Sequence, residues 1–300
     1  MNRTWAILRL AALSTIIFCS PEALAQTATE WVNKANEHYE AERFVESADA
    51  YDQAIEAGAK NPLTFYNAAC SAALANRVDA AFKHLDGAVA RGWRDVAFLE
   101  QDSDLTSLHD DPRWEELLAS CRQAGTDFLA SIEKPTLREE LLEMRRIDQA
   151  VRSGEPLPEL SDKDMGDVDA VNTARMKEIV EEHGWPTKRL VGEDGARSAW
   201  LLVQHADANP AFQRQCLELM KASDSGQVSA VDVAYLTDRV LVNEGKDQIY
   251  GTQFWTVDGY LVPRPIADEA RVEALRAEIG MTTMQEYHVL MTGLDWVPNQ

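Results

Sequence analysis

Apolar residues recur at the helical period along most of the chain, and one short segment carries a different pattern. In the C-terminal half the period predicts helices over 136–152, 167–183, 194–207, 210–222, 229–244 and 268–279. Turn residues fit the ends of these stretches, as where Gly184 precedes Trp185-Pro186. Between residues 248 and 265, aromatic and β-branched residues flank Asp258-Gly259, which is typical of a two-stranded hairpin. The pattern therefore predicts a mainly α chain with one small β-hairpin.

The N-terminal half carries an internal repeat. Residues of similar size recur 34 positions apart in the pairs Trp31 and Phe65, Ala35 and Ala69, Phe44 and Val78, Ser47 and Ala81, Tyr51 and Leu85, and Ala54 and Ala88. The small residues let two antiparallel helices approach closely, while the large ones fill the gaps beside them. This period and these residue types resemble the tetratricopeptide repeat. The resemblance implies a short helical array over 27–130 whose groove holds a peptide or protein partner; a purely supporting role toward the next domain is the alternative.

The third unit of this array is degenerate. The mostly polar stretch 101–105, which ends at Leu105, and the run Asp110-Asp111-Pro112 interrupt the helical period. We expect 95–123 to form a cap, whose last helix has Asp111 as its N-cap and Pro112 as its first residue. Lys134-Pro135-Thr136 then marks a hinge, and a second, mostly helical domain covers 136–300.

Two aspartates fall on apolar stripes of the helices predicted for the second domain. Asp148 follows Met144 by four positions and Asp238 follows Val231 by seven, so the helical phase turns both carboxylates toward the core. A carboxylate in the core must be paired or hydrogen-bonded. The expected partners are Arg145, Gln149, Arg152, His205 and Arg239.

The residues around these aspartates form short motifs. The motifs are Asp148-Gln149, Gly184-Trp185-Pro186, Gln204-His205-Ala206-Asp207, Asp238-Arg239 and Gln248-x-Tyr250-Gly251-Thr252-Gln253. Together they resemble the signature of a bacterial domain family of unknown function, which is often found alone or behind repeats in exported proteins. The resemblance covers about 136–291 and implies no particular activity.

Two interpretations of this polar set are open. In the first it is an enzymatic or ligand-binding site, in which His205, Asp238 and Asp148 are the candidate catalytic residues and His205 acts as general base. The candidate ligand-binding residues are Arg239, Gln248, Tyr250, Gln253 and Gln149. In the second interpretation the same side chains form a structural network that fixes how the helices and the hairpin dock.

No motif assigns a definite reaction or a bound metal. The sequence contains no Gly-x-Ser-x-Gly, phosphate loop, dinucleotide glycine pattern, CxxC or HExxH, so it predicts no cofactor and no metal. We therefore expect a protein-interaction or scaffold module whose repeats bind or support a partner. A hydrolase or a small-ligand-binding domain, with its polar site around His205 and Asp238, is the alternative.

Net charge and the N-terminal segment concern partners and location. The net charge of −21 repels phosphate backbones and anionic lipids, so we expect neither nucleic-acid binding nor membrane binding by the processed chain. Residues 1–25 have the features of a signal peptide, with an apolar run after Arg3 and a cleavage site after Ala25. A periplasmic or secreted protein is expected. In such a compartment Cys70 and Cys121 either form a disulfide or serve as small buried residues.

Overall fold

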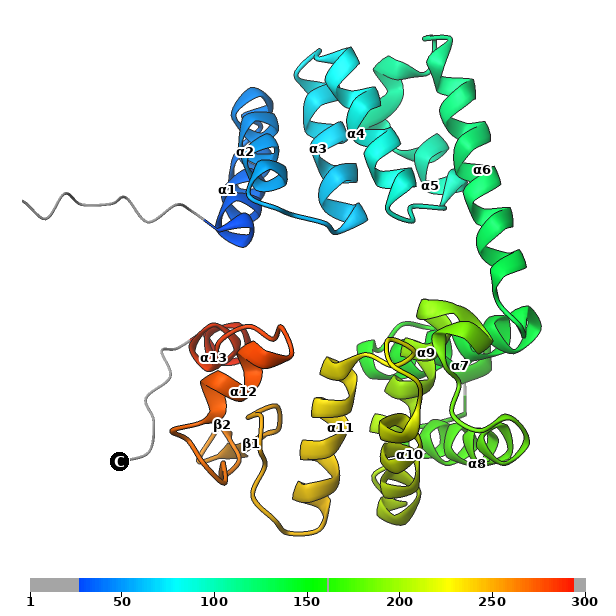
Figure 1. The fold of residues 1–300 in the computed structure, drawn as a ribbon, viewed down its shortest axis with the longest axis vertical. Helices are drawn as coiled ribbons and strands as arrows, with labels where there is room; N and C mark the ends of the chain where they lie inside the picture. Colours follow the sequence, from blue (N-terminus) through cyan, green and yellow to red (C-terminus); the bar gives the residue numbers. More distant parts are fainter. Residues whose placement is uncertain (1–26, 161, 294–300) are drawn as a thin grey trace, which may run out of the picture. The chain divides into compact units, whose positions relative to one another are not determined.

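The structure is a computed structural model that describes residues 27–160 and 162–293. Over these residues it is mainly helical with one small antiparallel sheet (Figure 1), which confirms the predicted fold class. The expected signal peptide lies outside the described residues. Among the helices described, none has the length and apolar character needed to cross a membrane. The chain divides into two units between Ala124 and Gly125, inside helix α6 (Arg113–Ser131).

Four helices of equal length open the first unit. They are α1 (Ala28–Glu40), α2 (Phe44–Glu56), α3 (Pro62–Leu74) and α4 (Val78–Ala90). Helix α3 begins 34 residues after α1, and α4 begins 34 residues after α2. Two helical hairpins thus repeat with the period of the sequence, while their membership of the tetratricopeptide class stays a prediction.

Small buried residues hold the two hairpins together. Ala35, Ser47, Ala69 and Ala81 are fully buried, so larger side chains at these positions would push the helices apart. The Ser47 hydroxyl donates to the backbone carbonyl of Ala35 at 2.9 Å, and it shares a second hydrogen bond of 2.9 Å with the hydroxyl of Ser71 in the next hairpin. The hydroxyl of Ser47 therefore ties one hairpin to the other inside the core.

The rest of the first unit is irregular, as the broken pattern predicts. It consists of α5 (Val96–Gln101), a 3₁₀ helix (Ser103–Leu108) and α6. The Asp102 carboxylate caps the 3₁₀ helix by accepting from the N–H of Asp104 at 3.0 Å. The Asp111 carboxylate accepts from the N–H of Arg113 at 2.9 Å. Asp111 therefore caps α6 as predicted, but the helix begins at Arg113, one residue after Pro112.

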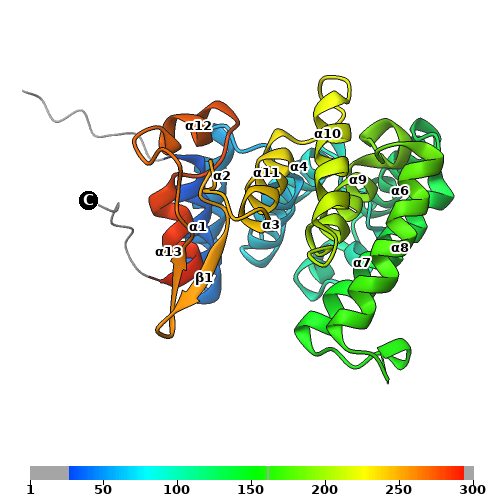
Figure 2. The same ribbon diagram turned by 90° about the horizontal axis from the view of Figure 1, so that it is seen from below.

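The second unit contains a bundle of helices followed by a smaller group of elements. The helices are α7 (Pro135–Ser153), a 3₁₀ turn (Pro158–Leu160), α8 (Met165–His183), α9 (Lys188–Gln204), α10 (Pro210–Ala222), α11 (Ala230–Asn243), α12 (Val272–Glu278) and α13 (Met284–Thr292). Helices α7 to α11 pack around a core that includes Leu141, Met176 and Trp200 (Figures 1 and 2). The six predicted helices are all present.

Helices α9 and α13 in this unit differ from the prediction. Helix α9 begins at Lys188 rather than at 194, because the hydroxyl of Thr187 caps its first turn. The segment still changes direction inside the helix at Gly192, which has a φ of 76°. Helix α13 was not predicted, since its apolar residues are irregularly spaced; a capping box between Thr283 and Glu286 sets its start.

The predicted β-hairpin is confirmed. Strands β1 (Phe254–Val257) and β2 (Tyr260–Pro263) pair in antiparallel register. The turn residues Asp258 and Gly259 have φ values of 51° and 86°, as a tight two-residue turn of the type favoured in hairpins requires. The hairpin follows α11 and leads into α12.

The three described cysteines are buried and unpaired. Cys70 and Cys121 do not form the disulfide that was one of the two alternatives, and Cys216 is equally free. Cys121 packs in the core of the first unit and Cys216 in that of the second. All three behave as small buried residues.

Candidate functional site

The first polar cluster joins α7 to the end of α9. Asp148 lies in α7 and is fully buried, as its place on the apolar stripe predicts. His205 is the C-cap residue of α9, and its Nδ1 lies 2.9 Å from Oδ1 and 3.0 Å from Oδ2 of Asp148. Within the described chain no hydrogen bond engages the other ring nitrogen, Nε2, and the His205 side chain is 18% exposed. The carboxylate thus holds the imidazole by one nitrogen and leaves the other for a ligand or a proton.

An arginine and a glutamine complete this cluster. Nη1 of Arg152 lies 2.9 Å from Oδ1 of Asp148, and its Nη2 lies 2.5 Å from Oδ1 of Asp169 in α8. Nε2 of Gln149 donates to Oδ2 of Asp148 at 2.7 Å. Ligand atoms of Asp148, Asp169 and His205 lie within 4.8 Å of one another, close enough for a metal ion. Because Arg152 already bonds both carboxylates, its guanidinium supplies the positive charge that a metal would bring.

The second polar cluster surrounds Asp238 of α11, which is also fully buried. Its carboxylate accepts from the backbone N–H groups of Ile249 (2.7 Å), Tyr250 (3.0 Å) and Thr252 (3.0 Å). It also accepts from the hydroxyl of Thr252 at 2.9 Å. Burial raises the pKa of Asp238, while these donors favour its anionic form and oppose that shift. The segment after α11 therefore wraps around the carboxylate of Asp238.

Arg276 of α12 holds the same segment through a carbonyl group. Its side chain is 1% exposed, and its Nη1 donates to the backbone carbonyl of Tyr250 at 2.6 Å. Its Nη2 has no hydrogen-bond partner among the described residues. Gly251, with a φ of 71°, cannot be replaced easily, since a Cβ there would lie 2.5 Å from Sδ of Met284. The buried carboxylate of Asp238 and the buried guanidinium of Arg276 thus both form hydrogen bonds with one short segment, 249–252.

Arg239 extends the second cluster toward the turn after α9. Its Nε lies 2.9 Å from Oδ1 of Asp207 in that turn, and its Nη1 donates to Oε1 of Gln253 at 3.2 Å. Nε2 of Gln253 donates to the hydroxyl of Thr252 at 3.1 Å. Gln248 fixes the backbone of Gln253 in both directions, by donating to its carbonyl at 3.0 Å and accepting from its N–H at 2.8 Å. The amide and guanidinium groups in this part are therefore engaged with the chain itself.

The candidate residues thus fall into two clusters. The first holds Asp148, Gln149 and His205, and the second holds Asp238, Arg239, Gln248, Tyr250 and Gln253. In the described chain no hydrogen bond joins Asp238 to Asp148 or His205. Of the expected partners, Gln149, Arg152 and His205 do contact Asp148. Asp238 instead meets three backbone N–H groups and the hydroxyl of Thr252. Arg276 is a residue that the sequence patterns did not single out.

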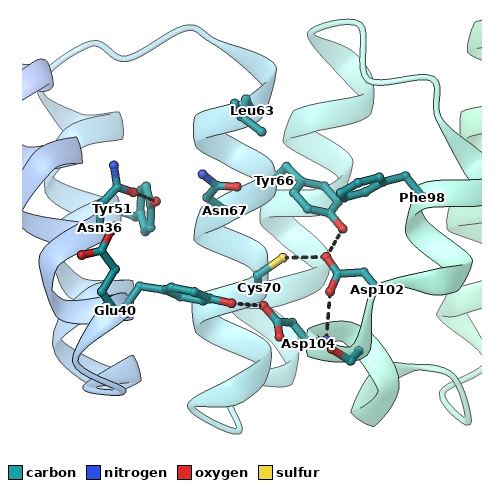
Figure 3. Close-up of a pocket in the computed structure, with 12 residues that line it drawn as sticks. Asn36, Glu40, Tyr51, Leu63, Tyr66, Asn67, Cys70, Phe98, Asp102 and Asp104 are labelled. Carbon is teal, nitrogen blue, oxygen red and sulfur yellow. Dashed lines mark hydrogen bonds between the residues drawn. The ribbon is translucent and has the colours of Figure 1, made fainter. Parts of the chain in front are cut away.

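The first unit contains a groove of about 540 Å³ (Figure 3). The residues that line it are Asn36, Tyr39, Glu40, Tyr51, Leu63, Tyr66, Asn67, Cys70, Phe98, Asp102, Ser103 and Asp104. Asn36 in α1 and Cys70 in α3 lie 34 positions apart and both face this groove, and Asp104, a further 34 positions along, faces it from the 3₁₀ helix. The predicted repeat rests on its large and its small positions. The same period, extended to the neighbouring polar positions, is the signal that leads to the groove.

Two aspartates of the groove bind tyrosine hydroxyls. The hydroxyl of Tyr39 donates to Oδ2 of Asp104 at 2.5 Å. The hydroxyl of Tyr66 donates to Oδ2 of Asp102 (Figure 3). The thiol of Cys70 lies 3.6 Å from the same oxygen of Asp102. Burial raises the pKa of the Cys70 thiol, and the charges of both aspartates raise it further. The thiol stays protonated, so Cys70 is neither a nucleophile nor a ready metal ligand.

Negative charge and apolar surface adjoin each other in the groove. Glu40, Asp102 and Asp104 contribute carboxylates, and none of the twelve described lining residues is Lys, Arg or His. Leu63 and Phe98 also line the groove and are 49% and 51% exposed. The groove therefore offers contacts to a group that is both cationic and apolar.

The second unit coincides with a known sequence family. The model of a family of unknown function, DUF6624, matches residues 135–295, which is more than half of the chain. This match agrees with the resemblance seen over 136–291, and it does not extend to the repeats of the first unit. Neither the curated proteins nor the solved structures contain a match to this chain.

Proposed function

We propose that this chain, which belongs to the family of unknown function DUF6624, is an interaction module. The family itself assigns no activity to it. In this proposal the groove of the first unit holds a basic peptide segment of a partner protein. The observation that carries the proposal is the acidic, partly apolar groove of about 540 Å³ built by successive repeat units.

The size and origin of the groove support peptide binding. Ligand pockets in proteins commonly enclose about 300 to 1,000 Å³, so a volume of about 540 Å³ suits several side chains of a bound segment. Stacked helical repeats use the surface formed by equivalent positions to bind extended partners. Asn36 and Cys70 are such positions.

The charge of the groove supports a basic segment rather than an acidic one. The described partners of Asp102 and Asp104 are neutral donors, namely tyrosine hydroxyls, a thiol and a backbone N–H. Glu40 adds a third carboxylate to the same lining. A lysine or arginine side chain would bring the compensating charge, and an adjacent apolar side chain would cover Leu63 and Phe98.

The expected location fits such a role. A cleaved signal over residues 1–25 would place the protein in the periplasm or outside the cell. A net charge of −21 would draw basic partners toward it and repel nucleic acid and anionic membranes. Location is part of the proposal, and fractionation of cells that express the full chain tests it.

The groove is tested with two short synthetic peptides, one of alternating lysine and leucine and one with glutamate in place of lysine. We expect the full chain to bind the lysine peptide, and binding to weaken as salt is raised. Replacing both Asp102→Asn and Asp104→Asn should weaken binding about tenfold, a loss of about 1.4 kcal/mol. Calorimetric titration measures each affinity.

A charge-matched variant controls for the acidity of the whole protein. Glu115→Gln with Glu116→Gln removes two exposed carboxylates of α6 that do not line the groove. This variant should bind the lysine peptide nearly as well as the parent chain. Equal weakening in both double variants, or equal binding of the glutamate peptide, would show that the groove does not select a basic segment.

The geometry of His205 favours a second candidate function, a hydrolase or group-transfer site in the second unit. Asp148 orients the imidazole through Nδ1, and Nε2 is free of hydrogen bonds within the described chain. That is the arrangement of a general base, which contributes about 10²- to 10⁴-fold to a reaction. Against this candidate, the neighbouring amides and guanidinium groups are occupied by the chain itself.

His205→Asn separates catalysis from structure, because asparagine keeps an N–H group near the position of Nδ1 but has nothing at Nε2. If the second unit hydrolyses one of a panel of chromogenic carboxylic and phosphate esters, the variant should lose at least 10²-fold in rate while its unfolding midpoint barely changes. A fall in stability with no activity in the parent chain would leave His205 a purely structural residue.

A further inference from the structure

A small cavity in the second unit has two tryptophans in its wall. Its volume is about 160 Å³, and it lies among the start of α9, the end of α10 and the start of α11. Trp185, Trp200 and Met220 line it and are themselves nearly buried. An apolar cavity of about 150 Å³ is known to hold a molecule of benzene, so this one has room for about six non-hydrogen atoms.

A buried carboxylate faces this cavity. Asp232 lies in the first turn of α11, and its side chain is 9% exposed. Oδ1 of Asp232 meets Nη1 of Arg197 at 3.3 Å, the long end of hydrogen-bond distances, and no hydrogen bond from a described residue reaches Oδ2. Burial raises the pKa of Asp232, so this carboxylate needs a cation beside it to stay charged.

The chain partly meets this requirement with an arginine from the surface. The side chain of Arg197 is 60% exposed, and its guanidinium carbon lies 5.2 Å from the centre of the Trp200 ring. Arg197 thus makes a cation–π contact and a long ion pair at the same place. The other cation of the lining, Lys188, pairs with Glu193 at 2.9 Å, and its charge also favours the ionised form of Asp232.

We infer that this cavity binds a small organic cation, of the methylated ammonium class, which takes the place of the Arg197 guanidinium. Indole rings and a thioether attract weakly hydrated organic cations, and the carboxylate of Asp232 provides the opposite charge. A bare metal ion fits poorly, because it needs several oxygen ligands and the walls at Trp185, Trp200 and Met220 provide none. The inference does not depend on the groove of the first unit.

Tetramethylammonium chloride is the ligand with which the full chain is tested. Its binding is followed by the indole N–H resonances of Trp185 and Trp200 in nuclear magnetic resonance spectra, and the affinity is taken from their titration. We expect a saturable shift of these resonances. Sodium chloride at equal ionic strength and tert-butanol, a neutral molecule of similar shape, should not produce it.

Two variants should change the affinity in opposite directions. Asp232→Asn removes the charge of the carboxylate and should weaken binding at least tenfold. Arg197→Ala removes the internal competitor and should strengthen binding severalfold, and it carries little risk to folding because that side chain is mostly exposed. Arg271→Ala, which removes an exposed cation outside the cavity, should leave the affinity unchanged.

The inference is overturned by any of three results. In the first, the indole resonances of Trp185 and Trp200 do not shift at saturating tetramethylammonium. The second is an equal response to tert-butanol, which would mean that the cavity selects shape and not charge. The third is an affinity in Arg197→Ala no higher than in Arg271→Ala; this comparison remains valid even if Asp232→Asn does not fold.

Discussion

The carboxylates of the two units differ in how their charge is balanced. In the polar clusters of the second unit, Asp148 has Arg152 and Asp207 has Arg239. Asp238 has four hydrogen-bond donors from the segment that Arg276 grips through a carbonyl. In the groove of the first unit, by contrast, the described partners of the aspartates are neutral donors.

This difference bears on function. Carboxylates that the chain neutralises itself need no cation from outside, and removing one of their partners would leave a buried charge uncompensated. Carboxylates that line an open groove without a cation leave that compensation to a molecule from outside. The comparison favours a structural role for most of the second unit's polar residues and a binding role for Asp102 and Asp104. His205 is one exception, since its Nε2 is unengaged within the described chain, and Asp232, with its long ion pair to Arg197, is another.

The largest effect is expected for Asp238→Asn. An amide nitrogen in place of one oxygen would face backbone N–H donors, which would leave buried donors without an acceptor. We expect a loss of about 3 to 5 kcal/mol in the free energy of unfolding of the second unit, measured by denaturant titration.

Two further variants allow the loss of unfolding free energy to be compared between the units. Asp247→Asn changes an exposed aspartate near α11 and should stay within about 0.5 kcal/mol of the parent chain. Asp104→Asn, in the groove, should cost less than about 1 kcal/mol, because its remaining carbonyl oxygen still accepts from Tyr39. If Asp104→Asn were as damaging as Asp238→Asn, the groove carboxylates would be structural too.

A smaller effect is expected for Arg152→Met. The apolar side chain would keep most of the packing of Arg152 but leave Asp148 and Asp169 without their shared cation. Because Arg152 is 20% exposed, we expect a loss of about 2 kcal/mol, less than for a fully buried pair. Arg146→Met, which breaks an exposed pair with Glu143, should cost under about 0.5 kcal/mol. An equal loss of stability in both variants would mean that Arg152 does not balance the negative charge of the first cluster.

Local patterns were enough to predict most of the helices, the hairpin and the burial of two aspartates. The helical period is a property of neighbouring residues, so the phase that turned Asp148 and Asp238 inward could be read directly from the chain. The 34-residue period likewise fixed where α3 and α4 begin relative to α1 and α2. These features do not depend on which distant segments meet.

The partners of the aspartates depended on distant contacts and were only partly predictable. Side-chain patterns carry no signal for backbone N–H groups, which are present at nearly every position, so the binding of Asp238 by 249–252 could not be anticipated. Arg276 has the spacing of an ordinary helix arginine, and only tertiary packing buries it. The groove aspartates lie in the irregular stretch 101–105, where the broken period concealed their relation to Asn36 and Cys70.

The smallest effect is expected on the loss of folding stability in acid. One carboxyl in each unit should contribute to that loss. Hydrogen bonds from Arg113 lower the pKa of Asp111 to about 2, and those from Arg214 and then Lys246 lower the pKa of Glu244 to about 2. Unfolded, such carboxyls titrate near about 4. A carboxyl whose pKa is lower in the folded state stabilises the fold above the unfolded value, and this contribution is lost as the pH falls from about 4 toward about 2.

Removing either carboxyl should therefore flatten the acid limb of the stability profile without altering its course above about pH 5. Asp111→Asn should act on the unfolding of the first unit and Glu244→Gln on that of the second, each by less than the replacements described above. Unfolding midpoints measured by circular dichroism from pH 6 to pH 2 follow the change. Asp110→Asn, adjacent to Asp111 but outside the pair with Arg113, should keep the parent slope. Were it to flatten the profile as much as Asp111→Asn, acid sensitivity would reflect total negative charge, and the balanced pairs would contribute nothing of their own.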